Sequence, residues 1–191
     1  MTVIMALKDN DGTIVYGADK QTTRYGYLSR ETSSKVVCKK VEVNEELEDT
    51  KDITILLTGI AHYTDYLTYV FKPPAIDGMN DFEYITFFIR TFREEIHEER
   101  FMKFDDSQTH FEGGMIIIFN NNIYSVENNL GVMLENECAV QGIGSEVAFG
   151  SLYSTKDEPP FQRIHIALDA CIELIDGVGK GKTVGIIQKE E

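Results

Sequence analysis

Cysteine is scarce in this sequence and irregularly placed. The 191 residues contain three cysteines, Cys38, Cys138 and Cys171, an odd number at wide spacing. A disulfide framework needs paired cysteines, so this distribution argues against one and favours a reducing, cytoplasmic location. Because each cysteine lies in or beside an apolar run, we expect three buried structural thiols.

Recognisable metal and nucleotide motifs are missing as well. The histidines stand outside any H-E-x-x-H or C-x-x-C pattern, so we predict no metal site and no cofactor. The stretch 177–183 (GVGKGKT) imitates a phosphate loop, but the Walker A spacing would require glycine at Asp176. The stretch also follows a predicted helix and opens a strand, whereas a phosphate loop opens a helix. We expect a turn, or a loop framing a site, and no ATP.

Positive charge and long apolar runs are both in short supply. Lys and Arg number 18 against 32 Asp and Glu, a net charge of -14, which would repel phosphates and predicts no nucleic acid and no anionic membrane as partner. No run approaches the ~20 apolar residues that span a bilayer, and the start lacks the pattern of a secretory signal. The length and the 42% apolar content fit a single domain over 1–191.

What the sequence does contain is a set of short apolar runs that begins at the N-terminus. The runs Val3–Leu7 and Thr13–Ala18 flank the segment 9–12 (DNDG), whose residue types tolerate tight turns. This pattern predicts a β-hairpin. Thr2 would begin one strand and Asp19 would end its partner, and those two ends are adjacent in an antiparallel pair.

The predicted hairpin brings a nucleophile and a carboxylate together. If Met1 is removed, Thr2 carries a hydroxyl and a free α-amine, whose pKa near about 8 lets the amine accept the hydroxyl proton. A charged Lys35, at the start of the third apolar run, would lower the pKa of that amine, and Asp19 would hold Lys35 in place. The residues therefore suggest an N-terminal-nucleophile (Ntn) hydrolase that depends on loss of Met1.

The rest of the pattern alternates strands with pairs of helices. Further strands are expected over 35–43, 53–57, 115–119, 123–126, 131–133, 138–140 and 183–187. Four helices are expected. One covers 60–71, a second begins at a capping box formed by Asn80 and Glu83, a third covers 146–153 with Ser145 as N-cap, and the fourth covers 161–175. Loops are expected over 22–30 and 104–110, with an acidic turn over 45–52. The order predicts an α+β fold, a four-layer αββα sandwich of two antiparallel sheets flanked by helix pairs.

In order and spacing, these runs resemble the proteasome β-subunit family, including its bacterial ring-protease relatives, over essentially the whole chain. T-V-I-M-A-L-K with V-Y-G-A-D is similar to the processed N-terminus and the A-A-D-like strand end of the family. S-S-K-V resembles the strand that carries the family's lysine, and I-L-L-T-G-I-A resembles the turn with the oxyanion-hole glycine. Q-G-I-G-S-E-V-A-F-G-S-L-Y resembles the G-S-G segment and its helix.

The resemblance implies an Ntn-hydrolase fold and a threonine-type peptidase without a cofactor. Thr2 would be the nucleophile with its amine as base, Lys35 would tune the amine, and Asp19 would orient Lys35. The backbone N–H of Gly59 would bind the oxyanion, and Asp176 would be a further acidic residue near the site.

Substrate and partners also follow from the resemblance. The backbone of Thr23 would pair with an extended polypeptide substrate. The family further implies a homo-oligomeric ring or related assembly, supplied with unfolded chains by an ATP-dependent unfoldase.

Two serines of the family pattern are replaced in this chain. Ile143 stands where the G-S-G segment supplies a serine, and Gly179 or Lys180 stands where a serine follows the late Asp. Because those serines help hold the N-terminal amine, a non-catalytic structural or assembly subunit of the same fold is an alternative function. A small-molecule Ntn amidase is the other alternative.

Overall fold

The computed structural model describes residues 2–24, 28–31, 34–44, 47–59, 61–98 and 113–189. Within these ranges the strands are β1 (Val3–Lys8), β2 (Ile14–Asp19), β3 (Gln21–Arg24), β4 (Leu28–Glu31), β5 (Val36–Asn44), β6 (Leu47–Leu57), β7 (Met115–Phe119), β8 (Asn122–Val126), β9 (Val132–Glu135), β10 (Cys138–Gly142) and β11 (Lys182–Ile187). The helices are α1 (Ala61–Tyr69), α2 (Asp81–Glu98), α3 (Ser145–Ser154) and α4 (Pro160–Leu174).

The predicted N-terminal hairpin is confirmed. Strands β1 and β2 pair antiparallel, with Ile4 opposite Ala18. The turn is closed by Asp9 N–H donating to Thr13 O at 2.8 Å and Gly12 N–H donating to Asp9 O at 3.0 Å. Gly12 has a φ of +90°, which a side chain would disfavour. The hairpin therefore returns the chain from the turn to the beginning of β1.

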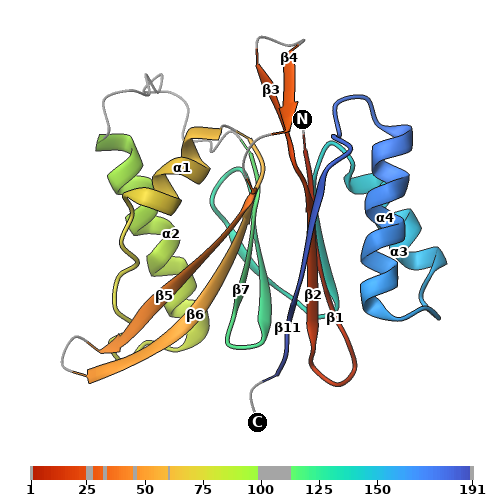
Figure 1. Cartoon of the computed structure of the whole chain (residues 1–191). Helices are drawn as coiled ribbons and strands as arrows, with labels where there is room; N and C mark the ends of the chain where they lie inside the picture. The colour runs from red at the N-terminus through yellow and green to blue at the C-terminus, as the bar shows by residue number, and fades with distance from the viewer. Residues whose placement is uncertain are drawn as a thin grey trace.

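Two antiparallel sheets lie face to face, and each carries a pair of helices on its outer side (Figure 1). One sheet has the order β10-β1-β2-β11 and is covered by α3 and α4. The other has the order β5-β6-β7-β8-β9 and is covered by α1 and α2. This arrangement confirms the predicted αββα sandwich.

Three apolar layers hold the sandwich together. Phe88 and Phe92 of α2 pack with Ile55 of β6 in the outer layer on one side. Between the sheets lie smaller side chains such as Ile4 and Ile116. Burying one such side chain contributes about 1.5–3 kcal/mol, so the layers supply the main stabilisation, while the short inter-sheet residues let the sheets approach closely.

One of the two predicted helix caps is confirmed. At the start of α2, Asn80 N–H donates to Glu83 Oε2 at 3.1 Å and Glu83 N–H donates to Asn80 Oδ1 at 3.0 Å, a reciprocal capping box. The cap predicted at Ser145 is wrong, because α3 begins there and Gly144 is the N-cap, without a side-chain hydrogen bond. A Cβ on Gly144 would lie 3.1 Å from both Cys171 Sγ and Val3 Cβ, so close packing explains the glycine.

Two segments predicted as irregular contain strands. The loop expected over 22–30 includes the β3–β4 hairpin, with Thr23 opposite Ser29, and the acidic turn expected over 45–52 is mostly β6. The paired strands β5 and β6 extend beyond the apolar layers, where Lys40 and Asp52 are exposed. Backbone pairing continues there without an apolar face, so the residue pattern does not report it. The loop expected over 104–110 lies outside the described residues.

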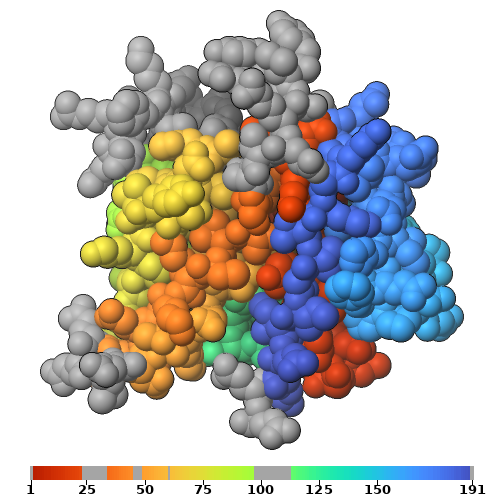
Figure 2. Space-filling view, viewed as in Figure 1, coloured from red at the N-terminus to blue at the C-terminus, as the bar shows by residue number. Residues whose placement is uncertain are grey.

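One edge of each sheet comes to the same face of the molecule. Strand β5 is at the edge of one sheet and β11 at the edge of the other. Figure 2 shows β5 and β6 in orange beside β11 in dark blue, with green atoms of the chain around β7 and β8 visible low between them.

Among the described helices, none combines the length and the apolar character that crossing a membrane requires.

Candidate active site

The carboxylate of Asp19 organises the end of the hairpin. Asp19 is fully buried and accepts four hydrogen bonds. Oδ1 accepts from Val3 N–H at 3.0 Å and from Lys35 Nζ at 2.7 Å. Oδ2 accepts from Gln21 N–H at 3.0 Å and from Gly179 N–H at 3.1 Å. The Asp19 carboxylate therefore connects Lys35 and two further segments of the chain to Val3, the residue after Thr2.

Lys35 approaches Asp19 from the other sheet. Lys35 is the residue before β5. Its backbone carbonyl accepts a hydrogen bond from Leu57 N–H at 2.9 Å, where β6 ends. The residue is 8% exposed, and this burial lowers the pKa of the Lys35 ammonium, while the adjacent Asp19 charge opposes the shift. A partly desolvated lysine beside a carboxylate is typical of sites that move protons.

Backbone contacts fix the position of Thr2. The residue is buried at 6% exposure, and its carbonyl accepts a hydrogen bond from Ile143 N–H at 2.9 Å. Gly142 has a φ of +101°, and a Cβ there would lie 2.1 Å from the same carbonyl oxygen. Met1 lies outside the described residues. Thr2 is thus held by β10 on one side and, through Val3, by Asp19 on the other.

Gly59 follows β6 at the same end of the sandwich as Lys35. It is exposed and has a φ of +100°, a conformation that favours glycine. The preceding carbonyl, Thr58 O, would be 2.2 Å from a Cβ on Gly113. The Thr58–Gly59 peptide is therefore packed closely against Gly113, which limits its orientation.

The structure describes no hydrogen bond or ion pair between this cluster and Asp176, and for Thr23 it describes only the backbone pairing. Asp176 is exposed in the turn after α4, and the contact from this turn to Asp19 comes instead from Gly179. Thr23 lies in β3, where its described partner is Ser29 of β4. The loop containing Gly179, expected to be a turn or a loop framing a site, contacts Asp19 through its backbone N–H.

The sequence reasoning did not identify Gly179 or Gln21 as donors to Asp19. A Cβ on Gly179 would lie 2.3 Å from Gln21 Cβ, so glycine is required for the loop to approach β3. Backbone donors carry no residue-type signature, because every residue other than proline has an N–H.

The expectation of three buried thiols is only partly met. Cys171 is buried and its Sγ donates to Gly144 O at 3.4 Å. Burial, with a further contribution from the Asp19 charge, raises the pKa of the Cys171 thiol to about 11. Cys138 is half-buried, and Cys38 is exposed. Cys38 lies on the edge strand β5, with Sγ 3.7 Å from Thr54 Oγ1, which explains why an apolar sequence context did not lead to burial.

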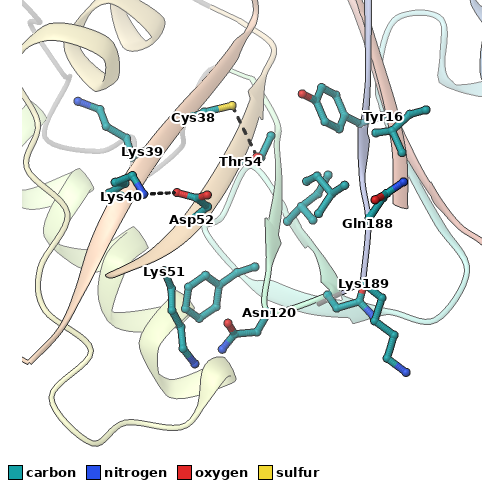
Figure 3. Close-up of a pocket in the computed structure, with 15 residues that line it drawn as sticks. Tyr16, Cys38, Lys39, Lys40, Lys51, Asp52, Thr54, Asn120, Gln188 and Lys189 are labelled. Carbon is teal, nitrogen blue, oxygen red and sulfur yellow. Dashed lines mark hydrogen bonds and ion pairs between the residues drawn. The ribbon is translucent and has the colours of Figure 1, made fainter. Parts of the chain in front are cut away.

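A cavity of about 750 Å³ opens between the sheets away from Thr2. Figure 3 shows it between the β5–β6 pair and the C-terminal strand, bordered by the Lys40–Asp52 ion pair and by Tyr16. Thr2, Asp19, Lys35 and Gly59 do not line it. Within the described ranges, no group of three or more His, Cys, Asp or Glu side chains is arranged to hold a metal ion.

Comparisons with known proteins extend this picture to the fold as a whole. No family model matches the sequence, and no curated protein matches it. BPH from Thiobacillus denitrificans is similar in structure, with a TM-score of 0.75, 19% identity and coverage of 100% of this chain and 99% of that chain. HslV from Trypanosoma brucei has a TM-score of 0.63 at 13% identity, covering 98% of this chain and 99% of its own.

Anbu, an ancestral β-subunit from Yersinia bercovieri, is also similar, with a TM-score of 0.69, 13% identity and coverage of 97% of this chain and 81% of that chain. At these identities the likeness concerns the fold. The two sheets and four described helices match the architecture that the sequence resemblance implies. The chain therefore has the Ntn-hydrolase fold of the proteasome-like proteins.

Proposed function

We propose that this protein is a threonine-type peptidase that hydrolyses peptide bonds with Thr2 as its N-terminal nucleophile after removal of Met1. One observation carries the proposal: the buried Asp19 carboxylate binds both Val3 N–H at 3.0 Å and Lys35 Nζ at 2.7 Å. A cation and its counter-ion are thereby held beside Val3, the residue that follows the proposed nucleophile. The similarity in fold to proteasome-like proteins supports the same class of chemistry.

The proposed reaction has two stages. The freed α-amine of Thr2 accepts the hydroxyl proton while the hydroxyl oxygen attacks the substrate carbonyl, and Gly59 N–H donates to the oxyanion. The C–N bond then breaks, the protonated amine returns its proton to the leaving group, and an ester on Thr2 remains. Water then attacks this ester and gives up a proton to the amine, the C–O bond to Thr2 breaks, the acyl group leaves as a carboxylic acid, and the amine returns the proton to the Thr2 oxygen. The Lys35 ammonium favours the neutral amine by like-charge repulsion.

Peptide substrates and self-assembly are part of the proposal. The β3–β4 hairpin follows Asp19 directly and has backbone groups that an extended polypeptide could pair with, and Thr23 lies in it. By its resemblance to the proteasome β-subunit family, the chain would form a homo-oligomeric ring or related assembly in the cytoplasm, with an ATP-dependent unfoldase delivering substrates.

Ile143 favours a second candidate, a non-catalytic subunit of the same fold. Isoleucine has no hydroxyl to offer to the amine of Thr2, and the Ile143 side chain is 53% exposed, although its N–H binds the Thr2 carbonyl at 2.9 Å. The peptidase is preferred because the Asp19–Lys35 pair is intact and buried. Burial of an ion pair is costly, and a scaffold would have no use for one at this place.

The deciding experiment combines intact-mass measurement with covalent labelling. Epoxomicin is a suitable probe, since a structure of BPH in complex with it exists. We expect purified protein to lack Met1, to gain one epoxomicin mass on Thr2, and to cleave fluorogenic peptides. Thr2→Ala should abolish labelling and cleavage, whereas Thr2→Ser should retain part of both, because serine keeps the hydroxyl and amine.

The alternatives give different results in the same experiment. Retention of Met1 with no labelling would support the scaffold. Labelling and turnover of small amides without cleavage of peptides would support the small-molecule amidase. Full peptide cleavage by Thr2→Ala would exclude Thr2 as nucleophile and overturn the proposal.

A further inference from the structure

Besides Lys35, another polar side chain crosses from one sheet to the other close to the Thr2 end of the sandwich. Gln141 belongs to β10, and its Nε2 donates to Val126 O of β8 at 3.2 Å. Strands β10 and β8 lie in different sheets. The described core between the sheets contains a cluster of apolar side chains, and apolar packing is non-directional. The Gln141 amide therefore adds a directional contact where packing alone would permit sliding.

The amide of Gln141 fills a space that a glycine leaves open. A Cβ on Gly114 would lie 1.9 Å from Gln141 Oε1 and 2.8 Å from Gln141 Cδ. Oε1 is buried and finds no hydrogen-bond donor among the described residues. A buried acceptor without a partner costs stability, so a purely structural role would be better served by an apolar side chain. We therefore look for the advantage of Gln141 in the position that its amide gives to neighbouring backbone.

Gly114 connects this contact to the Gly59 peptide. Thr58 N–H donates to Gly114 O at 2.9 Å, and Gly114 N–H donates to Thr58 Oγ1 at 2.6 Å. Next to it, Gly113 packs so closely on Thr58 O that a Cβ would be 2.2 Å away. Thr58 O and Gly59 N belong to the same peptide unit. The pair Gly113–Gly114 therefore determines where the Gly59 N–H points.

On its other side, Gln141 connects to Thr2 through the backbone. Gly142 packs on the Thr2 carbonyl, with only 2.1 Å between Thr2 O and a Cβ built on Gly142. Ile143 N–H donates to the same oxygen at 2.9 Å. The segment 141–143 thus holds Thr2 with its backbone and reaches the Gly59 side of the site with the Gln141 side chain.

We propose that Gln141 is a positioning residue that sets the separation between Thr2 on one sheet and the Gly59 peptide on the other. The inference rests on the proposed peptidase function. An oxyanion donor acts only when it lies about 2.7–3.1 Å from the developing charge, and a displacement of about 1 Å can cost about 100-fold in rate. Gln141 would act through Gly114 and Thr58 and would not touch the substrate.

The test separates removal of the amide from its displacement. Gln141→Met keeps an unbranched chain of similar length without the amide, and Gly114→Ala pushes the amide away without removing it. In both variants we expect kcat and the rate of epoxomicin labelling to fall about 10- to 100-fold, with KM changed little. The melting temperature of Gln141→Met should stay within about 4 °C of wild type. Gln162→Leu, an exposed glutamine on α4, is the matched control and should behave as wild type.

The double variant Gly114→Ala with Gln141→Ala distinguishes positioning from space filling. Removing the long side chain makes room for the new Cβ, so the melting temperature should recover relative to Gly114→Ala, while kcat should stay low. If kcat recovers together with the melting temperature, or if Gln141→Met has at least half the wild-type kcat, Gln141 only fills space and the inference is wrong. If wild type itself neither cleaves peptides nor takes up epoxomicin, the proposed function fails, and the inference fails with it.

Discussion

Asp19 and Gly179 are 160 positions apart in the sequence, and the N–H of Gly179 donates to Asp19 Oδ2 at 3.1 Å. This hydrogen bond joins the C-terminal loop to the end of the N-terminal hairpin. The other carboxylate oxygen binds Val3 N–H and Lys35 Nζ. Segments from both ends of the chain thus converge on one buried charge, so the integrity of the site depends on the completed fold and not on the hairpin alone.

The first prediction concerns the buried ion pair. Asp19→Asn removes the negative charge and leaves the Lys35 ammonium buried without a counter-ion, so the free energy of unfolding should fall by about 3–5 kcal/mol. Peptide cleavage should be lost. Urea unfolding at neutral pH measures the first effect. The matched control is Asp52→Asn, because Asp52 pairs with Lys40 at 3.5 Å with both side chains exposed, and its loss should cost at most about 1 kcal/mol. Equal costs for the two variants would contradict this interpretation.

Local features of the fold could be predicted because their causes are local. The turn at 9–12 depends on residues that tolerate tight φ values, and the α2 cap depends on Asn80 and Glu83, three residues apart. The apolar stripe of α2 has the helical period. The β3–β4 hairpin was missed because its polar residues have no apolar face, so backbone pairing leaves no pattern in the sequence.

The candidate site was predictable only in part. The proximity of the strand ends that carry Thr2 and Asp19 followed from the hairpin, whereas Lys35 was proposed beside them from its chemistry and from the family resemblance. The contact between Gly179 and Asp19 could not be foreseen, because it joins backbone to side chain over a long separation. Asp176 was assigned by resemblance and lies exposed in the structure, without a described contact to Asp19, so its proposed role remains a prediction.

The second prediction follows from the lowered pKa of Lys35. The unfolded chain keeps this lysine protonated up to about its ordinary pKa of 10.5, whereas burial makes the folded protein release the proton at lower pH. Between these two pKa values the unfolded state binds more protons, so the free energy of unfolding should rise with pH in that window. The slope is at most about 1.4 kcal/mol per pH unit for one proton.

Lys35→Arg provides the comparison for this pH effect. Arginine stays charged in both states, so the variant should lack the rise while keeping a cation near Asp19. Other groups, such as Tyr84, whose pKa burial raises, contribute equally to both proteins and cancel in the difference. Urea unfolding of both proteins from about pH 8 to about pH 10 measures this difference in the free energy of unfolding. A difference that does not change with pH would show that Lys35 does not titrate in this window.

The third prediction concerns the close approach of Gly142 to Thr2. Gly142→Ala introduces a Cβ 2.1 Å from Thr2 O at a φ of +101°. Backbone must move to relieve this contact, so we expect a loss of at least about 2 kcal/mol in the free energy of unfolding, together with a lower rate of peptide cleavage. Denaturant unfolding and the fluorogenic assay measure the two effects.

Alanine substitutions at two other glycines separate the cost of backbone strain from the cost of a steric clash. Gly78 has a φ of +76° but nothing within 4 Å of a Cβ, so Gly78→Ala should cost only about 1 kcal/mol. Gly150 lies within α3 with open space around it, so Gly150→Ala should stabilise by about 0.5–1 kcal/mol. If Gly142→Ala costs no more than Gly78→Ala, the contact with Thr2 O is not a constraint.

The last prediction uses the unequal exposure of the thiols. Cys38 is exposed, whereas Cys171 is buried, with a pKa raised to about 11. Because the thiolate is the reactive form, iodoacetamide at neutral pH should modify Cys38 in the folded protein and leave Cys171 unmodified until the protein is unfolded. Peptide mass mapping before and after addition of urea identifies the modified residue. Cys38→Ser should remove the fast reaction and retain peptide cleavage, since Cys38 lies on β5 beside the distal cavity. Rapid modification of Cys171 in the folded protein would mean that the packing of α4 on β1, behind Thr2, opens readily, and that the site is less rigid than its hydrogen bonds indicate.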